Sequence, residues 1–204
     1  MTSSPFETEL SAFDHAPAPH HAAVFYGSSS IRMWENLVQS FAGIPVVNRG
    51  FGGSTLAECL TLLPRIVYPL EPATLVLYAA DNDLDQGASP EHVEWLFGQF
   101  LAQLREHCPG LPVAYVSVKP SPARFWNVGS IRRANELVRN AASRHSGVAY
   151  IDVFGLMLNP SGGPRPELYQ EDGLHMSPAG YALWTSQIRP WLDAQPADKL
   201  ENRT

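Results

Sequence analysis

The chain has 204 residues, of which 45% are hydrophobic, and its formal net charge is −6 at pH 7. This length suits one α/β domain with a sizeable core, and the hydrophobic content excludes a disordered chain. The acidic balance, with no basic run that could neutralise phosphates, argues against a nucleic-acid partner.

Strands and helices are predicted to alternate along most of the chain. Residues 1–21 are rich in Pro, His and Ala without hydrophobic periodicity, which predicts an arm that lies on the surface or on a partner subunit of a homo-oligomer. Residues 22–195 form the predicted domain, and 196–204 a C-terminal tail. Short apolar runs predict strands at 22–26, 45–48, 73–79, 111–118 and 148–153. Helical spacing predicts helices at 31–41, 56–68, 90–107, 128–145 and 177–193, with Pro64 kinking or splitting the second of them.

This alternation predicts an α/β fold in which a five-stranded parallel sheet is covered by helices on both faces. Loops at the carboxyl ends of such strands build the functional site. Polar and glycine-containing segments follow the first three strands, at 27–30, 49–55 and 80–87, and residues 172–175 follow the fifth. We therefore expect these four segments to meet.

The residues in these segments suit acyl transfer. A serine hydroxyl needs an adjacent base, and the base needs an orienting group. Ser29 is the predicted nucleophile, His175 the predicted base and Asp172 the predicted orienting carboxylate. An oxyanion requires hydrogen-bond donors, which the backbone N–H groups of Ser29 and Gly53 and the side-chain amide of Asn82 would supply. Ser30 is expected to cap the following helix.

These segments resemble the four conserved blocks of a known family. Phe25-Tyr26-Gly27-Ser28-Ser29, Asn48-Arg49-Gly50-Phe51-Gly52-Gly53, Ala80-Asp81-Asn82-Asp83 and Asp172-Gly173-Leu174-His175 are similar to those of the SGNH hydrolases, also called the GDSL family. The resemblance implies a flavodoxin-like three-layer α/β/α sandwich and assigns Ser29, Gly53, Asn82, Asp172 and His175 the roles given above. Ser28 stands where the family usually has Asp, and Ala80 where it usually has Gly.

The sequence therefore predicts a serine esterase that hydrolyses short acyl esters of a small alcohol, a sugar or a lipid through an acyl-enzyme. The alternative is a catalytically inactive module of this fold that binds an acetylated sugar or a protein partner. Phe125 and Trp126 are candidates for the wall of an acyl pocket, or they belong to a packed surface loop. Arg49 and Arg124 are interpreted as members of structural ion pairs, with contact to an anionic substrate as the alternative.

No cofactor or metal site is predicted. Asp81, Asp83 and Asp85 imitate the start of a calcium-binding loop, but Gln86 and His92 occupy positions that need Gly and Glu. Cys59 and Cys108 are expected in helices as free thiols in a reducing cytoplasm. No apolar run approaches the ~20 residues of a membrane span, and the N-terminus lacks the pattern of a signal peptide, so we expect a cytoplasmic protein.

Overall fold

The computed structural model describes residues 6–16 and 18–195. The predictions for residues 1–5, for residue 17 and for the tail 196–204 lie outside the described residues. The chain forms one five-stranded sheet of β1 (Ala23–Gly27), β2 (Val46–Gly50), β3 (Thr74–Tyr78), β4 (Val113–Val116) and β5 (Val148–Ile151). All neighbouring strands are parallel, in the order β2-β1-β3-β4-β5, which confirms the predicted sheet.

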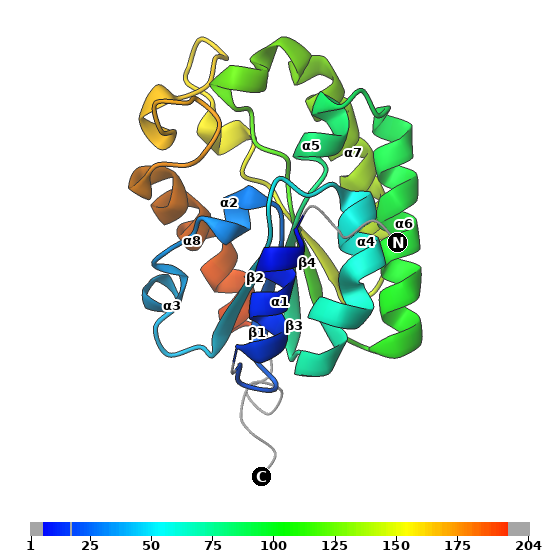
Figure 1. Ribbon diagram of the computed structural model, residues 1–204. Helices are drawn as coiled ribbons and strands as arrows, with labels where there is room; N and C mark the ends of the chain where they lie inside the picture. Colours follow the sequence, from blue (N-terminus) through cyan, green and yellow to red (C-terminus); the bar gives the residue numbers. More distant parts are fainter. Residues whose placement is uncertain (1–5, 17, 196–204) are drawn as a thin grey trace.

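Helices cover both faces of this sheet (Figure 1). The long helices α4 (Leu56–Ile66), α6 (Pro90–His107) and α7 (Val128–Ser143) pack on one face, and α2 (Ser29–Arg32), α3 (Leu37–Ser40) and α8 (Pro178–Asp193) pack on the other. Successive side chains of a strand point to opposite faces. Val24 and Tyr26 accordingly join the core under α4 and α6, while Ala23 and Phe25 join the core under α8.

Several local predictions need correction. The helix predicted at 31–41 is split into α2 and α3. Residues 33–36 between them form a turn, with hydrogen bonds between residues three apart such as Leu37 N–H to Trp34 O at 3.2 Å. The expected loop 80–87 contains the short helix α5 (Asp81–Asp85). Pro64 does not split α4: the helix continues through it to Ile66, and the next residue, Val67, still donates its N–H to Leu63 O at 3.0 Å.

The N-terminal segment contains a helix that the sequence analysis did not predict, α1 (Glu7–His15). Phe6, Leu10 and Phe13 recur at helical spacing, but the segment is too short for that pattern to stand out. Leu10 is fully buried in the core on the α4 side of the sheet. The helix is thus packed on its own domain (Figure 1). Formation of a homo-oligomer through this segment stays a prediction.

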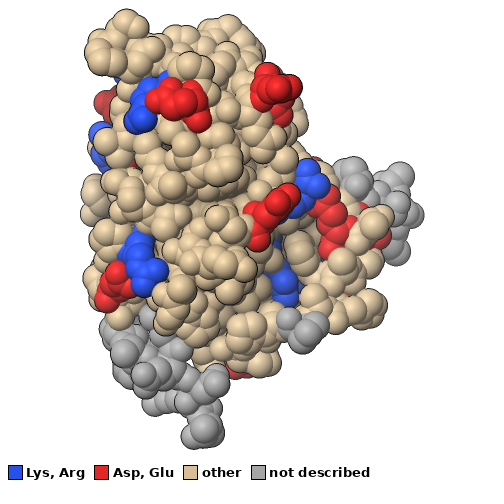
Figure 2. Space-filling view, turned by 90° about the vertical axis from the view of Figure 1, so that its left-hand side faces the viewer, with Lys and Arg blue, Asp and Glu red and all other residues tan. Residues whose placement is uncertain are grey.

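Three further features bear on the sequence predictions. Cys59 lies buried in α4 and Cys108 lies half-buried just after α6, both as free thiols whose pKa is raised by burial. No described helix is long and apolar enough to cross a membrane. Figure 2 shows charged side chains of both signs scattered over the face that lies on the left in Figure 1, with no broad basic patch there.

The sheet order places the site. β1 and β3 are neighbours at the centre of the sheet, and the chain leaves β1 for α2 on one face and β3 for α5 and α6 on the other. A crevice opens at such a switch point, outside the carboxyl ends of the strands. Ser29 follows β1 and Asn82 follows β3, so both residues stand at this switch point, outside the carboxyl ends of the strands.

Candidate active site

Ser29 is the first residue of α2, directly beyond the end of β1. The chain can turn there because Gly27 has a φ of +138° and lies against β3, where a Cβ would come within 1.8 Å of the Tyr78 carbonyl oxygen. Ser28 then takes the cap position of α2, and its N–H donates to Tyr78 O at 3.1 Å. The cap role predicted for Ser30 is wrong, since Ser30 lies inside α2.

Ser29, His175 and Asp172 form one hydrogen-bonded chain. His175 Nε2 lies 3.1 Å from Ser29 Oγ, and His175 Nδ1 lies 2.6 Å from Asp172 Oδ2. A carboxylate only accepts hydrogen bonds, so the proton of a neutral imidazole belongs on Nδ1, and Nε2 is free to accept from the serine hydroxyl. The structure therefore brings together the three residues predicted as nucleophile, base and orienting group.

The Asp172 carboxylate is fixed by its own turn. Its Oδ1 accepts the backbone N–H groups of Leu174 at 2.8 Å and His175 at 2.9 Å. Partial burial acts to raise the pKa of Asp172, but the hydrogen bonds from His175 and from these two backbone groups outweigh it and lower the pKa to about 2. Asp172 is consequently ionised at neutral pH and holds the imidazole in one orientation.

The predicted oxyanion donors Gly53 and Asn82 lie side by side. A Cβ built on Gly53 would stand 3.7 Å from Asn82 Nδ2, so only a glycine leaves this backbone open toward the amide without a side chain between them. Asn82 Nδ2 donates to Ser54 O at 2.9 Å, and Asn82 Oδ1 accepts from Arg124 Nη2 at 2.9 Å. Because Arg only donates and a carbonyl only accepts, these two partners fix which end of the amide faces which way.

A buried charged cluster supports Asn82. Asp81 lies between Lys119 Nζ at 2.7 Å and Arg124 Nη1 at 2.8 Å, and Tyr78 Oη also donates to it. Burial would raise the pKa of Asp81, but the charges of Lys119 and Arg124 outweigh it and hold the pKa below its usual value. Arg124 thus makes the ion pair that was predicted for it. Its second contact, with Asn82, was not predicted.

Two other supporting residues were missed. Asn48 in β2 donates to Ile31 O at 2.7 Å and accepts from Gly50 N at 2.9 Å, so it ties α2 to the end of β2, from which the loop with Gly53 continues. Asp83 accepts the N–H of Leu56 at 2.9 Å and so holds the start of α4, and burial raises its pKa. A polar residue within the apolar run that predicted a strand at 45–48 was the available signal for Asn48.

The segment predicted as a pocket wall forms the short helix η2 (Pro122–Asn127), in which Phe125 is half-buried and Trp126 is 72% exposed. This helix borders the site on two sides. Ala123 N–H donates to Gly173 O at 3.0 Å, within the turn that carries His175, and Arg124 contacts Asn82.

Arg49 is placed differently from its prediction. Its guanidinium lies 4.9 Å from the centre of the Phe13 ring and donates to Asn48 O, contacts that do not involve a carboxylate. In the described part of the chain, no group of three or more His, Cys, Asp or Glu side chains is arranged to hold a metal ion.

Solved structures share this fold. A putative platelet activating factor protein from Streptococcus pneumonia superposes with a TM-score of 0.79 at 20% identity, over 91% of this chain and 90% of its own. A putative acylhydrolase from Bacteroides fragilis gives 0.75 at 21% identity, over 93% and 94%. A family 3 carbohydrate esterase from Clostridium thermocellum gives 0.66 at 13% identity, over 85% and 98%. No curated protein is significantly similar in sequence.

The sequence itself matches the model of one family, the GDSL-like lipase/acylhydrolase family, over residues 17–183. This match spans most of the chain and all four segments of the site. The chain therefore belongs to the GDSL-like lipase/acylhydrolase family and is an SGNH-type hydrolase that acts on ester bonds.

Proposed function

We propose that this protein is a serine esterase that hydrolyses short acyl esters of a small alcohol, a sugar or a lipid through an acyl-enzyme intermediate. The observation that carries the proposal is the continuous contact from Asp172 through His175 to Ser29 Oγ at 2.6 and 3.1 Å. A nucleophile, a base and an orienting group within hydrogen-bond reach are the arrangement that nucleophilic catalysis needs.

In this mechanism Ser29 Oγ attacks the ester carbonyl carbon while His175 Nε2 takes the hydroxyl proton. The carbonyl oxygen becomes an oxyanion that accepts hydrogen bonds from the N–H groups of Ser29 and Gly53 and from the Asn82 amide. His175 then protonates the leaving alcohol as the C–O bond breaks. Water, deprotonated by His175, attacks the acyl-Ser29 ester and releases the acid, and the proton returns to Ser29.

The short acyl preference rests on the surroundings of the site. Phe125 and Trp126 belong to η2, which is tied to Gly173 on one side and to Asn82 on the other. Aromatic walls held in this way suit a small, shallow acyl group. We accordingly propose Phe125 and Trp126 as contacts of the acyl chain.

The test is hydrolysis of p-nitrophenyl acetate by the parent protein and by Ser29→Ala. We expect the parent to be active and Ser29→Ala to lose activity while keeping the parent melting temperature. A fluorophosphonate probe should label the parent at Ser29, as read by peptide mass spectrometry. Labelling of Ser28 or Ser30 would refute the assignment of the nucleophile. A parent without esterase activity or labelling would favour the non-catalytic binding module instead.

A further inference from the structure

Helix α1 makes contact with two parts of the candidate active site, although it precedes the family match at residues 17–183. One carboxylate makes both contacts. Glu9 Oε2 accepts the backbone N–H of Gly52 at 2.5 Å, and Glu9 Oε1 lies 3.4 Å from Arg32 Nη1. Gly52 directly precedes Gly53, and Arg32 ends the helix that Ser29 begins. Glu9 therefore joins the oxyanion loop to the nucleophile helix.

The oxyanion loop requires such support because it contains two successive glycines. The direction of the Gly53 N–H depends on φ and ψ of Gly52, and a glycine populates many more backbone conformations than other residues. Gly52 has a φ of +37°, in the left-handed region. A hydrogen bond to the Gly52 N–H fixes the peptide plane between Phe51 and Gly52. Because the Gly53 N–H follows from this plane through φ and ψ of Gly52, its direction is restricted as well.

The aromatic ring of Phe6, which belongs to the same N-terminal segment, also packs against Gly52. The Phe6 ring lies against Gly52 so closely that a Cβ there would come within 2.1 Å of the ring atom Cε1. The ring also packs edge-on against Phe51, with centroids 5.2 Å apart. Gly52 is thus held between an aromatic ring and a carboxylate, and both come from the N-terminal segment.

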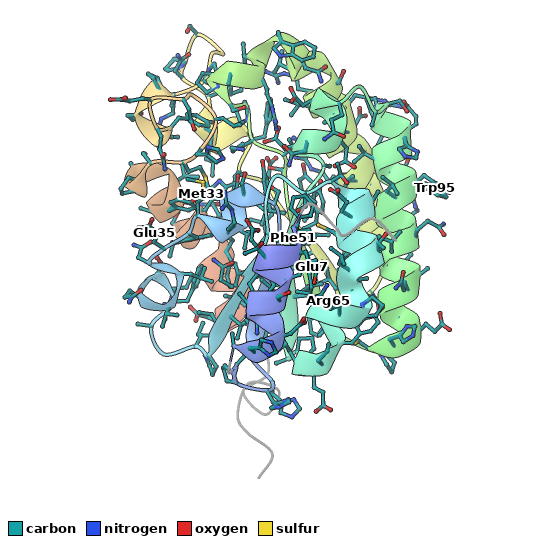
Figure 3. All side chains as sticks on the ribbon, viewed as in Figure 1. Glu7, Met33, Glu35, Phe51, Arg65 and Trp95 are labelled. Carbon is teal, nitrogen blue, oxygen red and sulfur yellow. The ribbon has the colours of Figure 1, made fainter. Side chains whose placement is uncertain are left out.

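Helix α1 is itself anchored, so Glu9 has a defined position. Arg65 of α4 donates to both Glu7 oxygens, at 2.8 and 3.0 Å, and to Asp14 at 2.6 and 3.2 Å. Figure 3 shows Glu7 and Arg65 beside each other, with Phe51 near the upper end of α1. The fully buried Leu10 side chain adds an apolar anchor one residue from Glu9.

We propose that Glu9 is a positioning residue for ester hydrolysis: by holding Gly52 it aims the Gly53 N–H at the oxyanion. The inference rests on the proposed function, in which Gly53 is an oxyanion donor. Loss of this contact should act on the transition state more than on substrate binding. Removal of a whole oxyanion donor costs about 10²–10³ in kcat, and release of a donor from its orientation should cost about 10-fold.

The test compares Glu9→Ala and Glu9→Gln with the matched control Glu7→Ala, all in the full chain. Glu7 lies on the same helix and contacts Arg65 and Ser11. In Glu7→Ala the helix keeps its anchors through the Arg65–Asp14 pair and the buried Leu10 side chain, so Glu9 stays in position. With p-nitrophenyl acetate, we expect Glu9→Ala to lower kcat about 10-fold with KM within about twofold. Glu9→Gln should recover most of this loss, because the amide oxygen can still accept the Gly52 N–H. Glu7→Ala should keep the parent kcat.

A second measurement does not depend on turnover. The amide proton of Gly52 donates to a carboxylate, so its NMR signal should lie downfield in the parent and in Glu7→Ala and shift upfield in Glu9→Ala. An unchanged kcat in Glu9→Ala, or an equal loss of kcat in Glu7→Ala, would overturn the inference about Glu9. In that case the proposed function still stands if the parent is active and Ser29→Ala is inactive. A parent that hydrolyses no ester would overturn both.

Discussion

The Asn82 amide is held on two sides, which makes its catalytic role testable at a single residue. Its Oδ1 is occupied by Arg124 and one of its two N–H groups by Ser54 O, so the other N–H is left for an oxyanion. We predict that Asn82→Ala lowers kcat by about 10²–10³ with little change in KM, as expected for a donor that acts in the transition state. Steady-state kinetics checks this, and a change confined to KM would instead make Asn82 a substrate-binding residue.

Asp172 should stay ionised as the pH falls, so that only protonation of the base itself would stop the proton transfer. A protonated imidazole cannot accept the Ser29 proton. Hydrogen bonds lower the pKa of Asp172 to about 2 against the effect of partial burial, so this carboxylate is almost fully ionised at pH values well above 2. We therefore predict that an acidic limb of kcat/KM at pH values well above 2 does not come from protonation of Asp172.

The matching substitution is Asp172→Asn, which keeps the size of the side chain but can no longer enforce a proton on His175 Nδ1. We predict a loss in kcat of up to about 10⁴-fold, through the wrong tautomer and orientation. A pH–rate profile of the parent and of this variant checks both statements. A parent profile whose acidic limb reports Asp172 at pH values well above 2 would contradict the lowered pKa of this carboxyl.

At the scale of the element, the start of α5 contains backbone strain. Ala80 has a φ of +86° and is fully buried, at the position where glycine is usual in the family that the sequence resembles. An alanine in this region costs about 1–3 kcal/mol. Ala80→Gly removes that cost but loses a buried methyl group and adds chain entropy, together about 1.5 kcal/mol. We predict that Ala80→Gly changes the unfolding free energy by between about −0.5 and +1.5 kcal/mol relative to the parent, the difference between these two effects.

The neighbouring residue provides the control, since Ala79 is equally buried and has no positive φ. Ala79→Gly loses the same methyl group without relieving strain and should destabilise by about 1.5 kcal/mol, or roughly 3–6 °C in melting temperature. Denaturant titration or calorimetry of the two variants separates the relief of backbone strain from the cost of losing a buried methyl group and adding chain entropy. Equal destabilisation by both substitutions would show that Ala80 carries no strain.

The elements that the sequence predicted well are those whose formation depends on residues within the same short segment. Continuous apolar runs such as Val24–Tyr26 predicted buried parallel strands, and the order of the elements predicted where their loops meet. The helix expected at 31–41 failed because Ile31, Trp34 and Leu37 keep helical spacing although the chain between them turns. Val38 follows the same spacing and is nonetheless 62% exposed. At this segment, periodicity alone therefore determined neither the path of the backbone between these residues nor the burial of each of them.

The site shows the same division. Ser29, Gly53, Asn82 and the Asp172–His175 pair could be named because each lies in a recognisable local motif. The contacts of Arg124 with Asn82 and of Glu9 with Gly52 join residues 42 and 43 positions apart. No local sequence pattern indicates which distant charged side chain contacts which site residue. These supporting residues could therefore be identified only from the three-dimensional structure.

At the scale of the whole molecule, the segments around the site are tied to one another. In the described residues, η2 is joined to the Asp172–His175 turn through Ala123 N–H and Gly173 O, to α5 through Asn127 Nδ2 and Leu84 O at 3.0 Å, and to Asn82 through Arg124. The site is therefore bordered by short segments that restrain one another, an arrangement that suits a shallow acyl pocket.

We predict that kcat/KM is greatest for p-nitrophenyl acetate or butyrate and does not rise for octanoate or palmitate. Each additional methylene group that a pocket could bury would contribute ~0.8 kcal/mol, about a fourfold gain in kcat/KM. A deep tunnel would therefore give a steady rise with chain length, whereas a shallow pocket gives none beyond the first few carbons. A maximum at octanoate or beyond would refute the shallow pocket.

The pocket wall can be tested by a matched pair of exposed tryptophans. Trp126 of η2 is 72% exposed beside the site, whereas Trp95 is 55% exposed on α6, among the helices that cover the sheet (Figure 3). If Trp126 contacts the acyl chain, Trp126→Ala should raise KM for butyrate more than for acetate, because the longer chain loses more apolar contact. Trp95→Ala should leave both constants at parent values. Equal constants in the parent and in both variants would remove Trp126 from the acyl pocket.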